Sequence, residues 1–255
     1  MLNHSTCSDW MVFIHGAGGS INTWKYQEDY FKNHYNLLLV DLRDHGLSKN
    51  LHRADSAYTF ELITADLLEV LDLLFIQKAS FITLSFGSVL IQHFALRYPE
   101  RIERCVFAGG IFSGGWLLKS AVYAALLLNK VLPYSLMYST FSYVLMPRKR
   151  NQLARKIYQQ QAALLTPNEY LRWVALYDQF FELLHDFRTS HLPFPALVVM
   201  GDEDYVFLSA AKSFVEIQPN MELSILTRCG HICNIEKPSD FNALVLDFLM
   251  VLRSN

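Results

Sequence analysis

The stretch Thr83-Leu84-Ser85-Phe86-Gly87-Ser88 joins an apolar, β-rich run at Ala79–Leu84 to a segment of helical periodicity at Phe86–Tyr98. A serine at such a turn has its hydroxyl lifted above the sheet, beside the positive end of the helix. The turn needs small neighbours, and Gly87 supplies one. Ser85 is therefore a candidate nucleophile, with simple capping of the helix as the alternative.

The alternation of strand and helix extends along the chain in both directions. Six apolar runs predict strands, at Trp10–Ile14, Asn36–Val40, Ala79–Leu84, Cys105–Ala108, Ala196–Met200 and Glu222–Leu226. Helical periodicity is found at Phe60–Leu74, Phe86–Tyr98, Ala210–Val215 and Asp240–Leu252. This alternation predicts an α/β fold, with a mostly parallel central sheet and helices on both of its faces.

One long interval breaks the alternation. From about Ile111 to Pro193 the sequence is helical and aromatic, and no strand is predicted. Such an interval is too long for a structureless connection in a compact domain. We therefore expect a helical cap, residues 112–193, inserted into a core made of residues 1–111 and 194–255.

An acidic group and a histidine follow the last two predicted strands. Gly201-Asp202-Glu203-Asp204 comes after one strand, and Gly230-His231 comes after the other. Because the carboxyl ends of parallel strands share one edge of a sheet, Ser85, an acid at 202–204 and His231 should converge there. A serine hydroxyl needs an imidazole to take its proton and a carboxylate to orient that imidazole. The sequence therefore predicts a triad in the chain order serine, acid, histidine.

A glycine-rich loop, His15-Gly16-Ala17-Gly18-Gly19, follows the first strand. Glycines let backbone amides turn inward, and we expect the N–H groups of Ala17 and Phe86 to form an oxyanion hole. Gly16 and the nearby Trp24 are candidate substrate contacts, with a place in the core as the alternative for Trp24. A phosphate-binding loop is disfavoured, because the Lys-Ser/Thr of a P-loop and the spacing of a dinucleotide fingerprint are missing.

Together these motifs resemble the α/β-hydrolase superfamily, in particular its small bacterial esterases and hydrolases. The resemblance covers nearly the whole chain and includes the segment Asp41-Leu42-Arg43-Asp44-His45-Gly46-Leu47-Ser48 and the Glu236-Lys237-Pro238 that follows Gly230-His231. It implies Ser85 as nucleophile and His231 as base, selects Asp204 over Asp202 as the acid, and implies no cofactor.

The sequence departs from the family's pattern in three places. Thr83 stands where a glycine usually precedes the nucleophile, and Asp44 replaces a glycine of the loop after the second strand. Only fourteen residues precede His15, so we expect the initial antiparallel strands of the fold to be shortened or missing. None of these departures removes a catalytic group.

Composition excludes several classes of partner. The chain has 255 residues, 52% of them hydrophobic and 18% charged, and a formal net charge of −2, so it lacks the basic field that nucleic acids require. Its most apolar stretch, Phe112–Pro147, is interrupted by Lys119, Lys130 and Pro133 before about 18 apolar residues accumulate, which argues against a membrane span. The N-terminal residues contain no apolar signal-peptide core, and we expect a cytoplasmic protein.

Two clusters have simple interpretations. Cys229, His231 and Cys233 could supply three zinc ligands, but a second ligand group at comparable spacing is missing, so we expect no metal and reduced, inert thiols. The Arg148-Lys149-Arg150 run is most simply a solvated helix start. Its alternative role is contact with an acidic substrate tail or a lipid headgroup.

The predicted reaction is hydrolysis of a carboxylic ester of an apolar or aromatic substrate through an acyl-enzyme, as in a carboxylesterase. The apolar residues of the cap favour a small apolar ester. The same triad serves C–C bond hydrolases and lyases, lactonases and thioesterases, and a non-catalytic ligand receptor can share the scaffold. The sequence specifies neither the exact substrate and pathway nor the oligomeric state.

Overall fold

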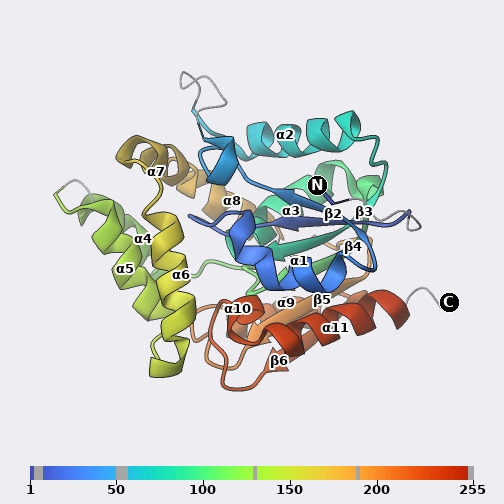
Figure 1. The fold of residues 1–255 in the computed structure, drawn as a ribbon. Helices are drawn as coiled ribbons and strands as arrows, with labels where there is room; N and C mark the ends of the chain where they lie inside the picture. The colour runs from blue at the N-terminus through green and yellow to red at the C-terminus, as the bar shows by residue number, and fades with distance from the viewer. Residues whose placement is uncertain (3–7, 50–56, 129–130, 188–189, 252–255) are drawn as a thin grey trace.

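The computed structural model describes residues 1–2, 8–49, 57–128, 131–187 and 190–251. At its centre lies a six-stranded sheet of parallel strands in the order β2-β1-β3-β4-β5-β6 (Figure 1). The strands are β1 (Trp10–Ile14), β2 (Asn36–Val40), β3 (Ala79–Leu84), β4 (Ile102–Ala108), β5 (Ala196–Gly201) and β6 (Met221–Leu226). The predicted fold class is confirmed, and β4 begins earlier than predicted.

Helices cover both faces of this sheet, as predicted. Figure 1 shows α1 and α11 side by side on one face and α2 and α3 on the other. The core helices are α1 (Lys25–Phe31), α2 (Phe60–Leu73), α3 (Phe86–Arg97), α9 (Leu208–Glu216), α10 (Cys233–Glu236) and α11 (Pro238–Val251). Short 3₁₀ turns are formed by Ile21–Trp24, Gly46–Ser48, Pro99–Arg101 and Lys149–Asn151.

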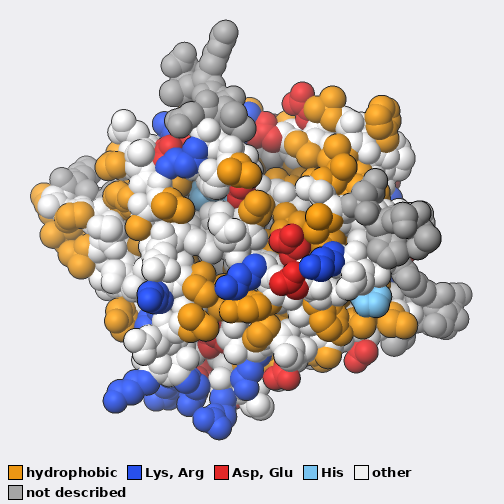
Figure 2. Space-filling view, in the orientation of Figure 1, with side chains coloured by type: hydrophobic (Ala, Val, Ile, Leu, Met, Phe, Trp, Pro, Cys, Tyr) orange, Lys and Arg blue, Asp and Glu red, His pale blue; other side chains and the backbone are white. Residues whose placement is uncertain are grey.

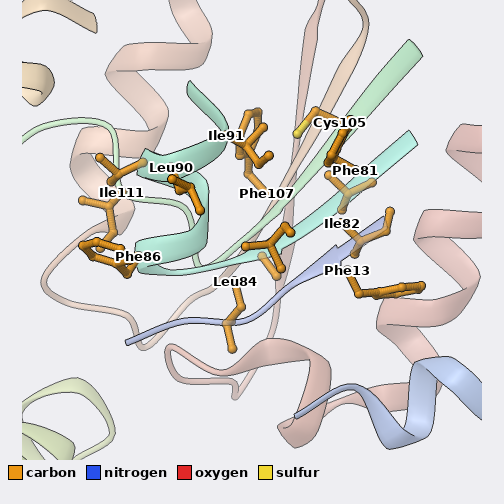
Figure 3. Close-up of a cluster of buried hydrophobic side chains, with 14 of the residues drawn as sticks. Phe13, Phe81, Ile82, Leu84, Phe86, Leu90, Ile91, Cys105, Phe107 and Ile111 are labelled. Atoms are coloured by element: carbon orange, nitrogen blue, oxygen red, sulfur yellow. The ribbon is translucent and has the colours of Figure 1, made fainter. Parts of the chain in front are cut away.

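The central strands are buried on both faces, which explains their continuous apolar sequences. All six residues of β3 are buried. Figure 3 shows Phe13 of β1, Phe81 of β3 and Phe107 of β4 gathered in one apolar cluster with side chains of α3. By contrast, β6 pairs on one side only and leaves Glu222 and Ile225 exposed. The strand that leads to Ser85 therefore lies in the most rigidly packed part of the sheet.

In the described residues between β4 and β5, where the sequence predicts a helical insertion, there are five α-helices. They are α4 (Trp116–Leu128), α5 (Tyr134–Leu145), α6 (Gln152–Ala162), α7 (Pro167–Val174) and α8 (Tyr177–Phe187). In Figure 1, α4, α5 and α6 form a separate layer at one end of the sheet. We retain residues 112–193 as the proposed cap and residues 1–111 and 194–255 as the proposed core.

An ion pair between a partly exposed arginine and a buried carboxylate attaches the cap to the core. Arg172 of α7 donates from Nε and Nη2 to the two carboxylate oxygens of Asp44, at 3.0 and 2.6 Å. Asp44 is fully buried and has a φ of +65°, a conformation that glycine adopts more easily. Next to this pair, Trp173 Nε1 donates to the carbonyl of Arg43 at 3.2 Å. The carboxylate at the family's usual glycine position thus has a partner, and that partner belongs to the cap.

Arg172→Ala should lower the free energy of unfolding by about 3 kcal/mol, because the buried Asp44 carboxylate loses its cation. Adding Asp44→Gly should recover most of this loss, since it removes the carboxylate and suits the positive φ. Urea denaturation checks both variants. Arg97→Ala, which breaks an exposed pair with Glu61, serves as a control expected to change little. Equal destabilisation of the single and double variants would contradict this role of the ion pair.

Candidate active site

Ser85 occupies a constrained turn between β3 and α3. Its φ of +51° is uncommon for a residue with a side chain. Its N–H donates to the carbonyl of Ala108 at 3.0 Å, and the N–H and Oγ of Ser88 donate to its carbonyl at 2.8 and 2.6 Å. The Ser85 side chain makes no capping hydrogen bond to α3, so the capping alternative is wrong.

Small residues make this turn possible. A Cβ atom on Gly87 would lie 2.8 Å from the main-chain oxygens of both Ile14 and His15, closer than Cβ atoms approach in real structures. Thr83, in contrast, is fully buried within the sheet, where its Oγ1 donates to the carbonyl of Val106 at 3.2 Å. The threonine that departs from the family's pattern is therefore accommodated without displacing Ser85.

His231 lies between Ser85 and an acid. Its Nε2 is 2.8 Å from Ser85 Oγ, and its Nδ1 is 2.7 Å from Asp204 Oδ2. Both His231 and Asp204 are buried, and the other carboxylate oxygen of Asp204 accepts the N–H of Phe207 at 3.1 Å. With Nδ1–H donating to the carboxylate, Nε2 is free to accept the serine proton. The three side chains have the geometry of a proton relay.

The two candidate acids have separate positions. Asp204 contacts His231, whereas Asp202 accepts the N–H of Cys229 at 3.1 Å and holds the loop that carries the histidine. Although desolvation opposes the change, hydrogen bonds from the backbone N–H groups of Arg228 and Cys229 lower the pKa of Asp202. Asp202 is thus a loop-stabilising carboxylate, and Asp204 is the one placed to orient the imidazole.

Two residues that line the cavity beside Ser85 have backbone N–H groups without an acceptor in the described part of the chain. Ala17 and Phe86 line the same cavity as Ser85. Among the residues that the structure describes, neither N–H has an acceptor. Phe86 is the first residue of α3, where helical N–H groups have no partner within the helix. Both amides are therefore available to a developing negative charge beside Ser85.

The cavity above Ser85 is bounded by the core and the cap. Its polar lining side chains are Thr23, Ser85, Tyr158, Gln161, Tyr177 and His231, and no Lys, Arg, Asp or Glu side chain is among the described residues that line it. Burial raises the pKa of Tyr158 and of Tyr177, which keeps both phenols neutral. The cavity suits an uncharged, largely apolar molecule.

The model of the α/β-hydrolase fold family matches residues 9–238 of this sequence. The chain belongs to the α/β-hydrolase family. It is 30% identical over 268 residues to a 2-hydroxy-6-oxononadienedioate/2-hydroxy-6-oxononatrienedioate hydrolase of Burkholderia vietnamiensis, an alignment that covers 96% of this chain and 88% of the relative. The chain is thus a hydrolase.

Solved structures agree with this membership. A hydrolase from Pseudomonas aeruginosa is 25% identical and superimposes with a TM-score of 0.79, over 98% of this chain and 92% of that one. An esterase from Exiguobacterium antarcticum is 17% identical and shares the fold, with a TM-score of 0.81 over 95% of this chain and 92% of the esterase.

One predicted substrate contact of the hydrolase requires correction. Gly16 lines the cavity, but Trp24 does not. Trp24 is fully buried and packs against Phe13, with 5.3 Å between ring centroids. The assignment of Trp24 to the substrate is therefore wrong, because the core between β1 and the 3₁₀ turn takes up its whole side chain.

Two buried histidines support the glycine-rich loop of the hydrolase. His15 donates from Nδ1 to the carbonyl of Gly16 at 2.8 Å and accepts the N–H of Leu42 on Nε2 at 3.1 Å. His45 donates from Nδ1 to the carbonyl of Arg43 at 2.7 Å and packs on the His15 ring at 4.8 Å. Desolvation lowers the pKa of both, that of His45 to about 3, so both rings stay neutral.

The Cys-x-His-x-Cys cluster does not form a metal site. Both ring nitrogens of His231 are engaged by Ser85 and Asp204. Burial raises the pKa of Cys229, and it raises that of Cys233 to about 12, so these thiols stay protonated. Among described residues, no group of three His, Cys, Asp or Glu side chains has the geometry to hold a metal ion. Cys7 lies outside them.

Sequence reasoning missed a contact between the cap and the histidine loop. The carboxylate of Glu236 accepts the N–H of Gly230 at 2.9 Å and also a hydrogen bond from Asn151 Nδ2, at the start of α6. Glu236 belongs to the Glu236-Lys237-Pro238 segment that resembles the family, but nothing in the sequence around Asn151 indicates this contact across 85 positions. His231 is thereby held through its neighbour Gly230.

No helix in the described part of the chain is both long and apolar enough to cross a bilayer, as predicted.

Stability should fall as the pH decreases from about 6.5 toward 3, because the unfolded chain protonates a histidine that the folded protein keeps neutral. For His45 the loss at pH 5 is about 2 kcal/mol relative to pH 7.5. His45→Gln should reduce this pH dependence by that amount, and His34→Gln, at an exposed position, should not. Urea denaturation at the two pH values measures the difference. An unchanged acid loss in His45→Gln would refute the buried neutral state.

Proposed function

We propose that this hydrolase cleaves carboxylic esters of small, uncharged, apolar or aromatic substrates through an acyl-enzyme. One observation carries the proposal: a Ser85–His231–Asp204 relay opens into a cavity whose described lining contains no charged side chain other than the relay's own histidine when protonated. The predicted cytoplasmic location is part of the proposal, and no step requires a cofactor.

The reaction divides into two similar halves. Ser85 Oγ attacks the ester carbonyl carbon while its proton passes to His231 Nε2, and the Asp204 carboxylate stabilises the imidazolium that forms. The N–H groups of Ala17 and Phe86 hold the negative charge of the carbonyl oxygen. The ester C–O bond then breaks, and His231 returns the proton to the leaving alcohol. Water repeats these steps on the acyl-enzyme and releases the acid.

A C–C bond hydrolase is the second candidate, because the Burkholderia relative is named for dienedioate and trienedioate substrates. Those substrates carry two carboxylates. An anion in an apolar cavity without a cationic partner loses its hydration with little compensation, and no Lys or Arg is among the described lining residues here. This absence favours a neutral ester, lactone or thioester over a dicarboxylate. A ligand receptor is disfavoured by the assembled relay.

Ser85→Ala should reduce ester hydrolysis by about 10⁴-fold or more and abolish labelling by a fluorophosphonate, because the nucleophile is lost. Asp204→Asn should lower kcat by about 10³- to 10⁴-fold, since the amide no longer fixes the imidazole tautomer. Turnover of p-nitrophenyl butyrate measures both.

Asp202→Asn is the matched control for the acid. It removes a carboxylate only two positions away that contacts Cys229 instead of His231, so kcat should stay within about tenfold of the parent while stability decreases. Loss of activity in Asp202→Asn with retention in Asp204→Asn, or labelling of Ser85→Ala, would overturn the proposed roles.

A pair of esters tests the charge of the substrate. The neutral p-nitrophenyl butyrate should have a kcat/KM at least about 100-fold above that of mono-p-nitrophenyl succinate, which has a terminal carboxylate on a chain of similar length. A 2-hydroxy-6-oxo dienedioate, assayed in parallel, should be turned over more slowly than the neutral ester. Faster turnover of the succinate ester would contradict the preference for an uncharged substrate, and faster turnover of the dienedioate would favour the C–C hydrolase.

A further inference from the structure

The outer helices of the cap expose an unusual amount of apolar surface. Trp116, Leu127 and Leu128 of α4, Val131 in the connection, and Val144 of α5 are each about half exposed or more, with Val131 at 79% and Trp116 at 75%. We call the outward side of α4, residues 131–133, α5 and the adjoining residues 148–156 the cap face. Figure 2 shows hydrophobic side chains gathered over the outer end of these helices, at the left.

The helix α4 is apolar on more than one side. Leu118 and Val122 line the substrate cavity, while Leu127 and Leu128, further along the same helix, face solvent. A helix with apolar residues all round is normally buried in a core or in lipid. Here the cavity accounts for one side of α4, and none of the described residues covers the other.

The charge of this region points to one kind of occupant. Residues 112–168 contain seven Lys and Arg side chains and no Asp or Glu, in a chain whose net charge is −2. Among the described ones, Lys119, Arg148, Lys149, Arg150 and Lys156 are exposed. Figure 2 shows a cluster of basic side chains at the lower left, below the apolar end of the cap.

Two of these cations are available for an external partner. Arg148 and Arg150 interact with Glu203, but Lys149 and Lys156 form no ion pair with any described residue. Leu153, which is 56% exposed, lies one helical turn from each of them. Lys149 of the 3₁₀ turn and Leu153 and Lys156 of α6 therefore put cationic and apolar side chains close together on the exposed surface beside α5.

We propose that the cap face docks on an anionic lipid bilayer. A bilayer surface offers both components that the face requires, an apolar layer for the exposed Leu, Val and Trp side chains and acidic headgroups for the cations. A second copy of this chain is a poorer fit, because pairing through the same face would bring like charges together. Since no described helix spans a membrane, the contact is peripheral.

Docking would place the cavity next to substrate that is dissolved in the bilayer. Phe141 and Leu145 of α5, like Leu118 and Val122 of α4, line the cavity, so the two helices that would contact lipid also form its wall. Only the layer formed by α4 and α5 would then separate an apolar ester in the bilayer from the cavity that contains Ser85. This delivery rests on the proposed esterase function, whereas docking itself does not.

Flotation with lipid vesicles tests the docking. Wild-type protein at 0.1 M NaCl should float with vesicles of equal parts phosphatidylglycerol and phosphatidylcholine, and at least about tenfold less should bind pure phosphatidylcholine. Lys149→Glu/Lys156→Glu and Leu127→Asp/Val131→Asp should each lower the partition coefficient for the anionic vesicles at least about tenfold. Thermal unfolding of each variant verifies that it is folded.

Matched controls keep the result specific. Lys78→Glu/Lys212→Glu reverses two exposed charges outside the cap, and Leu73→Asp changes an exposed leucine of α2; both should float like the wild type. Ser85→Ala should also float, which separates docking from catalysis. Absence of flotation by the wild type, or equal losses in cap and control variants, would overturn the proposal. So would a dimer that Leu127→Asp/Val131→Asp dissociates in sedimentation velocity.

Discussion

The site depends on a close approach of two backbone segments at Gly87. The first turn of α3 lies so near the end of β1 that a single added carbon would meet the carbonyl oxygens of Ile14 and His15. Next to this contact the chain reverses at Ser85, whose positive φ raises the hydroxyl above the sheet. Ala17 and Phe86 lie close to this contact in sequence and line the same cavity as Ser85, so one constraint affects both the nucleophile and its surroundings.

Behind this contact, buried polar groups keep the surrounding loops in place. His15 joins the glycine-rich loop to Leu42 in the loop after β2, His45 packs on His15, and the adjoining Asp44 reaches the cap through Arg172. A similar connection runs on the other side from Asn151 through Glu236 to the loop of His231. The cap is thus connected to both loops that surround the reactive serine, which couples the shape of the cavity to the position of the relay.

The sequence predicts the parts of this structure that follow from local pattern. Strands buried on both faces are continuous apolar runs, so β1, β2 and β3 are predicted to the residue. The helix α1 is not predicted, because its buried residues include the polar Gln27 and so do not form an apolar stripe. Gln27 Nε2 donates a hydrogen bond to Asn242 Oδ1 at 2.8 Å. The helix α4 is not predicted as a separate element either, since it is apolar on several sides and has no clear period. The partner of Asp44 lies 128 positions away, and only the folded chain reveals it.

The near-neutral net charge of the protein conceals a strong separation of charge. Residues 112–168 contain seven Lys and Arg side chains and no Asp or Glu, so their formal charge is +7. The whole chain has 22 basic and 24 acidic residues, so the rest of the chain has a formal charge of −9. The protein is therefore asymmetric in charge, and its positive part is residues 112–168 of the cap. The electric field of a negatively charged surface would therefore turn the cap of the protein toward that surface. This orientation would begin at about one Debye length from the surface, before any apolar side chain made contact.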